Sequence, residues 1–386
     1  MKIVLCMATK QNPVNTLPLE LPNIRPDLVC VAITGTMEEQ GSELISQIQA
    51  LGIRTERLDV PNENSLRALL QLFEDWLESR IDYEIYVNLT GGTKLMSLAA
   101  YQVFSSYGFR CFYQILKNNQ TLQSNQIIWL DDESVVSGIG EKISLERYLA
   151  SYQFKITQRE RVQEIPEVHI QYAEEIFKRL KTNYESCSRT MTKLNGICAE
   201  KINASDRENF IKNLTTDESG FIDHLAHETG LFTLFADKIE YANNDDSIRK
   251  LIAGGWLEVL TTIKIREATQ TRDLSMNVSF EKSTKRVGTA SRNELDVMAM
   301  VGAALYIVEC KTVNWEGRTP IKPEDSIYKL SALSDIGGLN TKSAFVSLVE
   351  ISETAKTRAA ENNIELICGK SIIELPSRLR RWISAE

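Results

Sequence analysis

The first third of the chain alternates short runs rich in apolar and β-branched residues with longer amphipathic stretches. The runs predict strands at 2–8, 27–34, 53–60, 83–89 and 109–116. The stretches between them predict helices at 41–51, 65–79 and 93–107. Strands that alternate with helices of this length indicate a parallel sheet covered on both faces, so a Rossmann-like α/β domain is expected. No G-x-G-x-x-G follows the first strand, which argues against a conventional dinucleotide site.

The pattern changes in the middle of the chain. A stripe of apolar residues after Val168 has helical spacing and indicates a long helix that faces a core or an interface: Ile170, Ala173, Ile176, Phe177 and Leu180. Polar turns dominate residues 206–236 and give no clear element. We therefore interpret 146–245 as a partly helical connector between an N-terminal domain over 1–145 and a C-terminal domain over 246–386.

The last part of the chain returns to strands and helices. The pattern predicts a helix at 247–260, a strand at 273–282 and a hairpin whose two strands flank Gly302. After the hairpin it predicts a helix at 324–333, a strand at 342–348, a helix at 352–362 and a strand at 364–368. This order of elements indicates a mixed α/β/α sandwich.

Composition adds limits on function and location. The chain has 386 residues, of which 43% are hydrophobic and 25% charged, as in ordinary globular proteins. Its net charge of −8 argues against binding nucleic acid through overall positive charge, so any such contact must be local. The seven cysteines are odd in number and form no C-x-x-C pair, which argues against a disulfide framework and favours a reducing cytoplasm.

No membrane partner and no zinc site are expected. The apolar run at the N-terminus is too short for a signal peptide, and no apolar run is long enough to span a bilayer. His224 and His227 share a helical face, but neither an H-E-x-x-H pattern nor a cysteine partner accompanies them.

A glycine turn follows the fourth predicted strand, in V-N-L-T-G-G-T-K over 87–94. Gly91 and Gly92 let the backbone turn sharply, and Thr90 or Thr93 caps a helix whose free N–H groups point at the strand ends. Lys94 adds a cation, so the turn fits an anion or a nucleotide. A tight, well-capped strand-to-helix turn without a ligand is the alternative.

Two further polar loops are expected at the same edge of the sheet. Thr9 follows the first strand and Thr36 follows the second. Open α/β sheets bind ligands at the carboxyl ends of their strands, so three such loops predict a pocket. None of them supplies a nucleophile with a base, which favours binding over chemistry.

The stretch from Glu294 to Lys311 reads ELDVMAMVGAALYIVECK and brings charged residues together. A turn at Gly302-Ala303 places Asp296 opposite Glu309. Because side chains alternate along a strand, Lys311 lies on the same face as Glu309. The hairpin therefore presents two carboxylates and one ammonium on one surface.

This set of residues fits metal-dependent phosphodiester hydrolysis. Asp296 and Glu309 supply hard oxygen ligands for Mg²⁺ or Mn²⁺, and the backbone carbonyl of Cys310 is a candidate third ligand. Lys311 is placed to position water or to stabilise the transition state. Glu258, on the preceding predicted helix, is an additional carboxylate for the metal or its waters.

Less specific interpretations remain for several basic residues. In this register Lys311 also faces Glu294, so a cross-strand salt bridge is an alternative. Lys329, on the next predicted helix, either contacts the scissile strand or is simply solvated. A basic run beside the hairpin either holds a nucleic-acid backbone or forms a solvated strand edge: Lys264, Arg266, Arg272, Lys282, Lys285, Arg286 and Arg292.

Both ends of the chain resemble known families. The spacing Asp296–x12–Glu309–x–Lys311, with Glu258 ahead of it and the elements in this order, resembles the PD-(D/E)XK nuclease superfamily. The first 135 residues, with N-L-T-G-G-T-K, resemble CARF domains, which sense cyclic oligoadenylates in type III CRISPR immunity. Together they resemble the CRISPR ancillary nucleases that this messenger activates.

The resemblance implies a homodimer with a cyclic oligoadenylate, expected to be cyclic tetra-adenylate, on its two-fold axis. It also implies a site for the ring's phosphates, riboses and bases: Thr9, Thr36, Asn88, Thr90, Gly91, Gly92, Thr93 and Lys94. The implied catalytic residues are Glu258, Asp296, Glu309, Lys311 and Lys329. The implied reaction is metal-dependent cleavage of single-stranded DNA or RNA, or nicking of duplex DNA. A regulator without catalysis and a constitutive DNA-processing nuclease are the alternatives.

Overall fold

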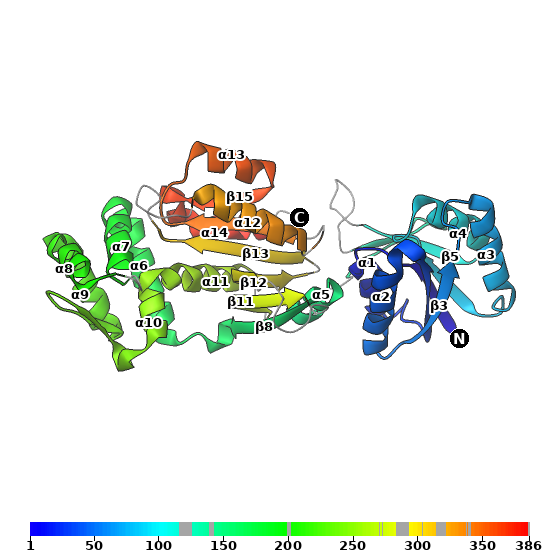
Figure 1. Cartoon of the computed structure of the whole chain (residues 1–386), viewed down its shortest axis with the longest axis horizontal. Helices are drawn as coiled ribbons and strands as arrows, with labels where there is room; N and C mark the ends of the chain where they lie inside the picture. The colour runs from blue at the N-terminus through cyan, green and yellow to red at the C-terminus, as the bar shows by residue number, and fades with distance from the viewer. Residues whose placement is uncertain are drawn as a thin grey trace.

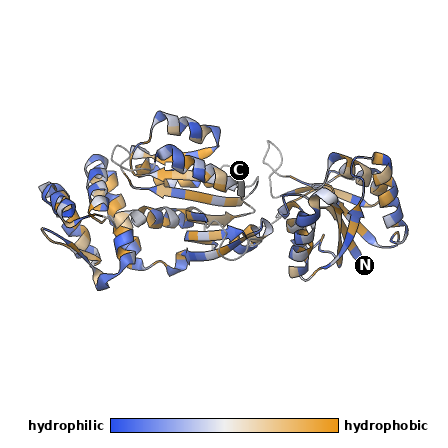
Figure 2. Ribbon diagram, viewed as in Figure 1, coloured by the Kyte–Doolittle hydropathy of each residue, from blue (hydrophilic) through white to orange (hydrophobic). Residues whose placement is uncertain are grey.

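The chain folds into two α/β bodies and a helical region (Figure 1). The computed structural model describes residues 1–115, 126–138, 143–198, 202–269, 271, 273–282, 293–302, 304–313, 322–336, 338 and 341–384. Hydrophobic residues concentrate in the strands and polar residues on the outer faces of the helices (Figure 2). No helix within these ranges is long and apolar enough to cross a membrane.

The N-terminal body is built on a sheet of order β3-β2-β1-β4-β5-β6-β7. Its strands are β1 (Lys2–Met7), β2 (Leu28–Thr34), β3 (Arg54–Val60), β4 (Glu84–Asn88), β5 (Arg110–Gln114), β6 (Ile127–Trp129) and β7 (Val135–Val136). The five predicted strands are confirmed and pair in parallel. The pattern did not predict β6 and β7, which are too short to show a period and pair antiparallel.

Helices cover both faces of this sheet, as predicted. They are α1 (Pro13–Thr16), α2 (Glu38–Ala50), α3 (Leu66–Glu78) and α4 (Lys94–Ser106). Ser65 and Thr93 cap α3 and α4 through their side-chain oxygens, which fixes where both helices begin. Ile3 and Leu5 of β1 pack against α3 and α4, whereas the alternating Val4 and Cys6 face the side of α2.

The middle of the chain is more divided than the sequence pattern indicated. It contains α6 (Glu167–Thr182), α7 (Tyr184–Cys198), α8 (Ala204–Lys212), α9 (Thr216–Thr229), β9 (Phe232–Leu234) and β10 (Ile239–Tyr241). The expected single long helix is wrong, because Asn183 leaves helical geometry at φ −151° and ψ 85° and separates α6 from α7. The apolar stripe itself is buried at Ala173, Ile176, Phe177 and Leu180.

The C-terminal body is a six-stranded sheet of order β15-β14-β13-β12-β11-β8. Its strands are β8 (Phe154–Arg161), β11 (Leu274–Lys282), β12 (Asn293–Val301), β13 (Ala304–Lys311), β14 (Thr341–Ser347) and β15 (Ile364–Cys368). β8 comes from the predicted connector and pairs antiparallel with β11 as an edge strand. The connector region therefore contributes to this sheet.

Helices again cover both faces. α11 (Trp256–Thr269) and α14 (Leu375–Ser384) share one hydrophobic core with α6, whereas α12 (Pro323–Ile336) and α13 (Glu353–Glu361) lie on the other face. The expected helix at 247–260 is wrong in its limits. The chain instead forms α10 (Asp246–Lys250), a π-helical turn at Leu251–Gly255, and α11, which continues to Thr269.

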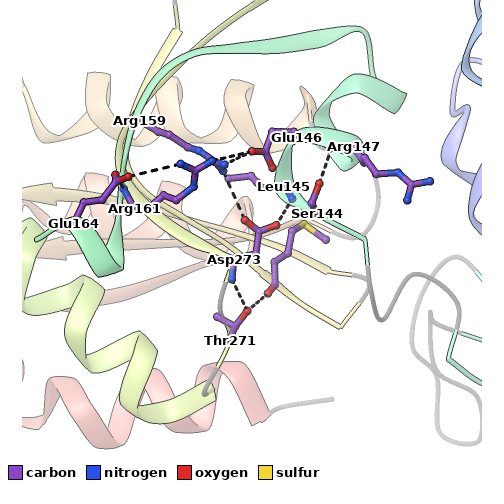
Figure 3. A network of polar contacts seen from close by, with 10 residues as sticks. Ser144, Leu145, Glu146, Arg147, Arg159, Arg161, Glu164, Thr271 and Asp273 are labelled. Atoms are coloured by element: carbon purple, nitrogen blue, oxygen red, sulfur yellow. Dashed lines mark hydrogen bonds and ion pairs between the residues drawn. The ribbon is translucent and has the colours of Figure 1, made fainter. Parts of the chain in front are cut away.

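A short helix, α5 (Leu145–Ser151), joins the two bodies. The backbone N–H of Leu145 at its start donates to the Asp273 carboxylate of the C-terminal body (Figure 3). Arg159 of β8 pairs with both Glu146 and Asp273. Arg147 points the other way and pairs with Glu20 of the N-terminal body at 2.9 Å. Charged groups on α5 thus contact both bodies.

Candidate active site and candidate ligand site

The hairpin has the register that the sequence predicted. Gly302 turns the chain at φ +58°, Met300 pairs with Leu305, and Val297 pairs with Val308. The next position of this register places Asp296 opposite Glu309, so the two carboxylates meet at the end of β13.

Lys311 joins the two carboxylates, as expected from strand alternation. Its Nζ lies 2.6 Å from Glu309 Oε1 and 3.5 Å from Asp296 Oδ2. The same Nζ donates to the carbonyl oxygen of Cys310 at 3.1 Å, while the Cys310 N–H donates to Asp296 Oδ2 at 2.6 Å. Lys311 therefore turns toward the acidic pair, and no ion pair to Glu294 forms between these described residues.

Lys329 also reaches the site. Its Nζ on α12 lies 3.6 Å from Glu309 Oε1, so two ammonium groups share one carboxylate oxygen. The second oxygen, Glu309 Oε2, has no hydrogen-bond partner and is buried, in a residue that is only 3% exposed. A buried carboxylate oxygen without a partner is costly, which makes this atom a candidate ligand for a cation.

Glu258 completes the acidic group from the first turn of α11. Burial, and then the negative charge of Asp296, raise the pKa of Glu258 well above its usual value, and Lys311 lowers it. Burial and the charge of Glu309 raise the pKa of Asp296 to about 6. The charges of Asp296 and Glu309 both act on Glu258, which places the three carboxylates within one electrostatic site.

A metal ion would have to draw these groups closer together. Among the described residues, no group of three or more His, Cys, Asp or Glu side chains is gathered tightly enough to hold a metal ion. The Lys311 ammonium lies between Asp296 and Glu309 and neutralises them. The unpartnered Glu309 Oε2 and the mutual repulsion of the carboxylates nevertheless fit a divalent ion.

The basic run beside the hairpin is only partly described. Lys264 is on α11, is 8% exposed and pairs with Glu174 and Glu267, so it is neither solvated on a strand edge nor open to a nucleic-acid backbone. Arg266 also lies on α11, and Lys282 ends β11. The other four lie outside the described residues: Arg272, Lys285, Arg286 and Arg292.

The glycine turn sits against β1, the neighbour of β4 in the sheet. A Cβ on Gly91 would lie 2.3 Å from the carbonyl oxygen of Met7, and Gly92 has φ +76°. Only glycine fits both positions without moving β1. The turn is thus held at the junction of β1 and β4, where the connections leave in opposite directions and ligands usually bind.

Asn88 and Thr90 brace this turn from within. Asn88 is 1% exposed, and its Nδ2 donates to the carbonyl of Val14 at 2.8 Å and to Asn15 Oδ1 at 3.0 Å. Its Oδ1 accepts from the Thr90 N–H, and Thr90 Oγ1 accepts from the Gln114 N–H. Both side chains therefore hold the shape of the turn.

The remaining predicted ligand-binding residues form the exposed rim. Gly92, Thr93 and Lys94 are exposed at the start of α4, where Thr93 Oγ1 caps the Met96 N–H. Thr36 is exposed and contacts Thr34 Oγ1 at 2.9 Å. Thr9, which is half-buried, accepts a long hydrogen bond from the Gln11 N–H at 3.5 Å.

Sequence reasoning missed the feature that places Glu258. Gly254, in the π-helical turn before α11, has φ +147°, which a side chain would not tolerate. The signal was present as the pair Gly254-Gly255, but it was interpreted as part of a regular helix. The π-helical turn packs against Asn195 and Thr312, and the sequence did not reveal these contacts because neither residue belongs to a recognisable motif.

Comparisons with known proteins agree with this architecture. The family model for Card1 CARF domains matches residues 20–148, and that for Card1-like endonuclease domains matches residues 245–386. No curated protein sequence is similar enough to count as a match.

Several solved structures share the fold at low sequence identity. Can2 from Sulfobacillus thermosulfidooxidans in complex with cyclic tetra-adenylate is 21% identical, with each chain covered completely and a TM-score of 0.78. Protein VC1899 from Vibrio cholerae is 20% identical over 100% of this chain and 98% of that one, with a TM-score of 0.81. A type III CRISPR defence DNA nuclease activated by cyclic oligoadenylate is 16% identical over 89% of this chain and 45% of its own, with a TM-score of 0.54. Residues 20–148 of this chain therefore belong to the Card1 CARF domain family, and residues 245–386 belong to the Card1-like endonuclease domain family.

Proposed function

We propose that this protein is a metal-dependent endonuclease that cyclic oligoadenylate activates in type III CRISPR defence. The observation that carries the proposal is the cluster of Asp296, Glu309 and Lys311, with a buried Glu309 oxygen that has no partner. A purely structural carboxylate pair would be fully hydrogen-bonded, since a half-satisfied buried charge destabilises the fold.

Four groups of this chain would hold the metal, either Mg²⁺ or Mn²⁺. They are the carboxylates of Asp296, Glu309 and Glu258 and the carbonyl of Cys310. A divalent ion bound by them supplies a Lewis acid for the phosphate and a water of lowered pKa. The Lys311 ammonium, which now neutralises Glu309 at 2.6 Å, is then free to hold the attacking water or the charge that develops on the phosphate.

Lys329 is placed to contact the scissile strand. It is 49% exposed and its Nζ lies 3.6 Å from Glu309 Oε1, so it borders the site from the solvent side. An ammonium there would attract a phosphate and would lose its carboxylate partner once a metal binds. We assign it to substrate binding.

The activator is proposed to be cyclic tetra-adenylate, bound between two copies of the CARF domain. The Can2 structure of the same fold was solved with that ligand. In this chain the exposed rim of Gly92, Thr93 and Lys94 supplies N–H groups and a cation for its phosphates, and Thr9 and Thr36 line the neighbouring loops. A two-fold arrangement would place two such rims around one ring, which is why we propose a homodimer.

Coupling between the two sites is assigned to α5 and the groups around it. The Asp273 carboxylate and Arg159 hold the start of α5, and Met300 of β12 donates its N–H to the carbonyl of Asp273. Asp296 lies four residues earlier on the same strand, about 13 Å away. A ligand activates the nuclease only if it binds the active arrangement of the two bodies more tightly than the resting one.

The test is cleavage of single-stranded DNA, single-stranded RNA and supercoiled plasmid with Mn²⁺ and cyclic tetra-adenylate. Glu309→Gln and Lys311→Ala should each abolish cleavage, whereas Glu361→Gln, at the exposed end of α13, should not. Wild-type activity in Glu309→Gln would contradict the assignment. Binding of the adenylate without any cleavage would favour a regulator, and strong cleavage without adenylate would favour a constitutive nuclease.

A further inference from the structure

We infer that Asn195 is a positioning residue of the endonuclease site, through which helix α7 sets the separation of Glu258 from Lys311. This inference rests on the proposed metal-dependent function. Asn195 lies on α7, more than sixty residues before the first motif carboxylate, and belongs to no nuclease motif.

The first observation is a hydrogen bond at the end of the motif strand. Asn195 Nδ2 donates to Thr312 Oγ1 at 2.8 Å. Thr312 is 6% exposed and directly follows Lys311. A side chain on α7 therefore holds the residue next to the catalytic lysine.

The second observation is the packing of the π-helical turn against the same hydroxyl. A Cβ on Gly254 would lie 2.4 Å from Thr312 Oγ1 and 3.5 Å from Asn195 Nδ2. The absence of a side chain and the φ of +147° let the turn lie directly on Thr312. Three segments, namely α7, the π-helical turn and the end of β13, thus meet at one hydroxyl group.

The third observation connects this junction to the acidic cluster. Glu258 follows Gly254 by one helical turn, and its Oε2 would lie 4.0 Å from a Cβ on Gly255, so the carboxylate folds back toward the turn. Lys311 contacts the other two carboxylates, with its Nζ 2.6 Å from Glu309 Oε1 and 3.5 Å from Asp296 Oδ2. Because Thr312 contacts the turn on one side and adjoins Lys311 on the other, moving Thr312 changes the geometry between Glu258 and Lys311.

Asn195 therefore acts through Thr312 and does not touch the reacting atoms. Residues that orient metal ligands from behind affect metal affinity or activity about 10- to 100-fold when they are removed. We expect Asn195→Ala to weaken Mn²⁺ binding about tenfold and to slow cleavage at a fixed, subsaturating Mn²⁺ concentration.

The experiment is calorimetric titration of the full-length protein with Mn²⁺, together with cleavage rates at several Mn²⁺ concentrations in the presence of cyclic tetra-adenylate. Thr312→Val should reproduce the loss in Asn195→Ala, and Thr312→Ser, which keeps the hydroxyl, should restore most of the wild-type affinity. The double variant Asn195→Ala with Thr312→Val should lose no more than either single variant, since both remove the same bond.

Thr192→Val is the matched control. Thr192 also lies on α7, and its hydroxyl donates to the carbonyl of Ser188 within the same helix at 2.9 Å. If Thr192→Val binds Mn²⁺ as the wild type does, with a thermal midpoint like that of Asn195→Ala, the loss in Asn195→Ala comes from positioning and not from a general loss of stability. Equal Mn²⁺ affinity in wild type and Asn195→Ala, or an equal loss in Thr192→Val, would overturn the inference. A wild-type protein that binds no Mn²⁺ would instead refute the metal-dependent function and the inference with it.

Discussion

Replacing Asp296 with asparagine should make the metal-free protein more stable while abolishing cleavage. Asp296 is 15% exposed and faces Glu309, with Glu258 nearby. Burial and the charge of Glu309 raise its pKa to about 6, from the usual 3.8 of an aspartate. The fold therefore tolerates the charged carboxylate poorly, and asparagine removes the charge while keeping an oxygen that can accept from the Cys310 N–H.

The expected gain in unfolding free energy follows from how far folding raises the pKa of Asp296. A shift of about two pKa units corresponds to about 3 kcal/mol of unfolding free energy, at 1.36 kcal/mol per unit. Because folding raises this pKa, the protonated form favours the fold, and stability is lost as the pH rises from about 4 to about 6. The attraction of Lys311, whose Nζ lies 3.5 Å from Asp296 Oδ2, already lowers this pKa and is contained in the shift. We expect a net gain of about 3 kcal/mol at pH 8.

Scanning calorimetry of the C-terminal unfolding transition is the assay. A gain of about 3 kcal/mol corresponds to an increase of about 6–12 °C in its midpoint for a body of this size. The gain should fall to about half at pH 5 and disappear toward pH 4, where the wild-type carboxylate is protonated. With Mn²⁺ at 100 times its dissociation constant, the wild type should gain about 2.7 kcal/mol and the variant much less.

Glu361→Gln is the control for this experiment, because it neutralises an exposed carboxylate at the end of α13, on the same body, and should change stability by less than about 0.5 kcal/mol. An Asp296→Asn protein that is less stable than wild type at pH 8 would refute the electrostatic reasoning. A gain that does not change between pH 8 and pH 4 would refute it as well.

Three further predictions concern the CARF domain and its coupling to the nuclease. Gly91→Ala should destabilise the protein by more than about 1 kcal/mol and weaken cyclic tetra-adenylate binding, because the new Cβ would lie 2.3 Å from the Met7 carbonyl oxygen. Thermal unfolding tests the first effect and calorimetry the second, and wild-type values would contradict the tight packing of the turn. Lys94→Ala should weaken adenylate binding without lowering the thermal midpoint, because the side chain is exposed; unchanged affinity in calorimetry would contradict its role in binding. Asp273→Ala should leave adenylate binding intact but reduce adenylate-stimulated cleavage, since it removes the partner of Leu145 and Arg159; unchanged stimulation would exclude this route.

Local chemistry made much of this structure predictable. The β4–α4 turn followed from two glycines and a capping threonine: Gly92 turns the chain at φ +76°, and Thr93 caps α4. The register of the hairpin followed from period-two alternation around Gly302, which sufficed to place Asp296 beside Glu309 and Lys311. In both cases the decisive contacts lie close together along the chain.

The features that the sequence did not reveal depend on contacts between distant segments. Asn183 breaks the predicted helix although asparagine is tolerated within helices, because α6 and α7 pack as separate elements. β8 joins the C-terminal sheet more than a hundred residues away from β11, its partner. Asn88 was predicted to bind ligand, but its burial among Val14, Asn15 and Thr90 depends on the fold around it.

The most direct test of the account is one cleavage assay on a single-stranded substrate, with and without cyclic tetra-adenylate and with Mn²⁺ either supplied or chelated. We expect cleavage only when both the adenylate and Mn²⁺ are present, and none under any condition with Glu309→Gln. Cleavage that persists when Mn²⁺ is chelated, or that is unchanged by the adenylate, would contradict the proposal that this chain is a ligand-activated, metal-dependent nuclease.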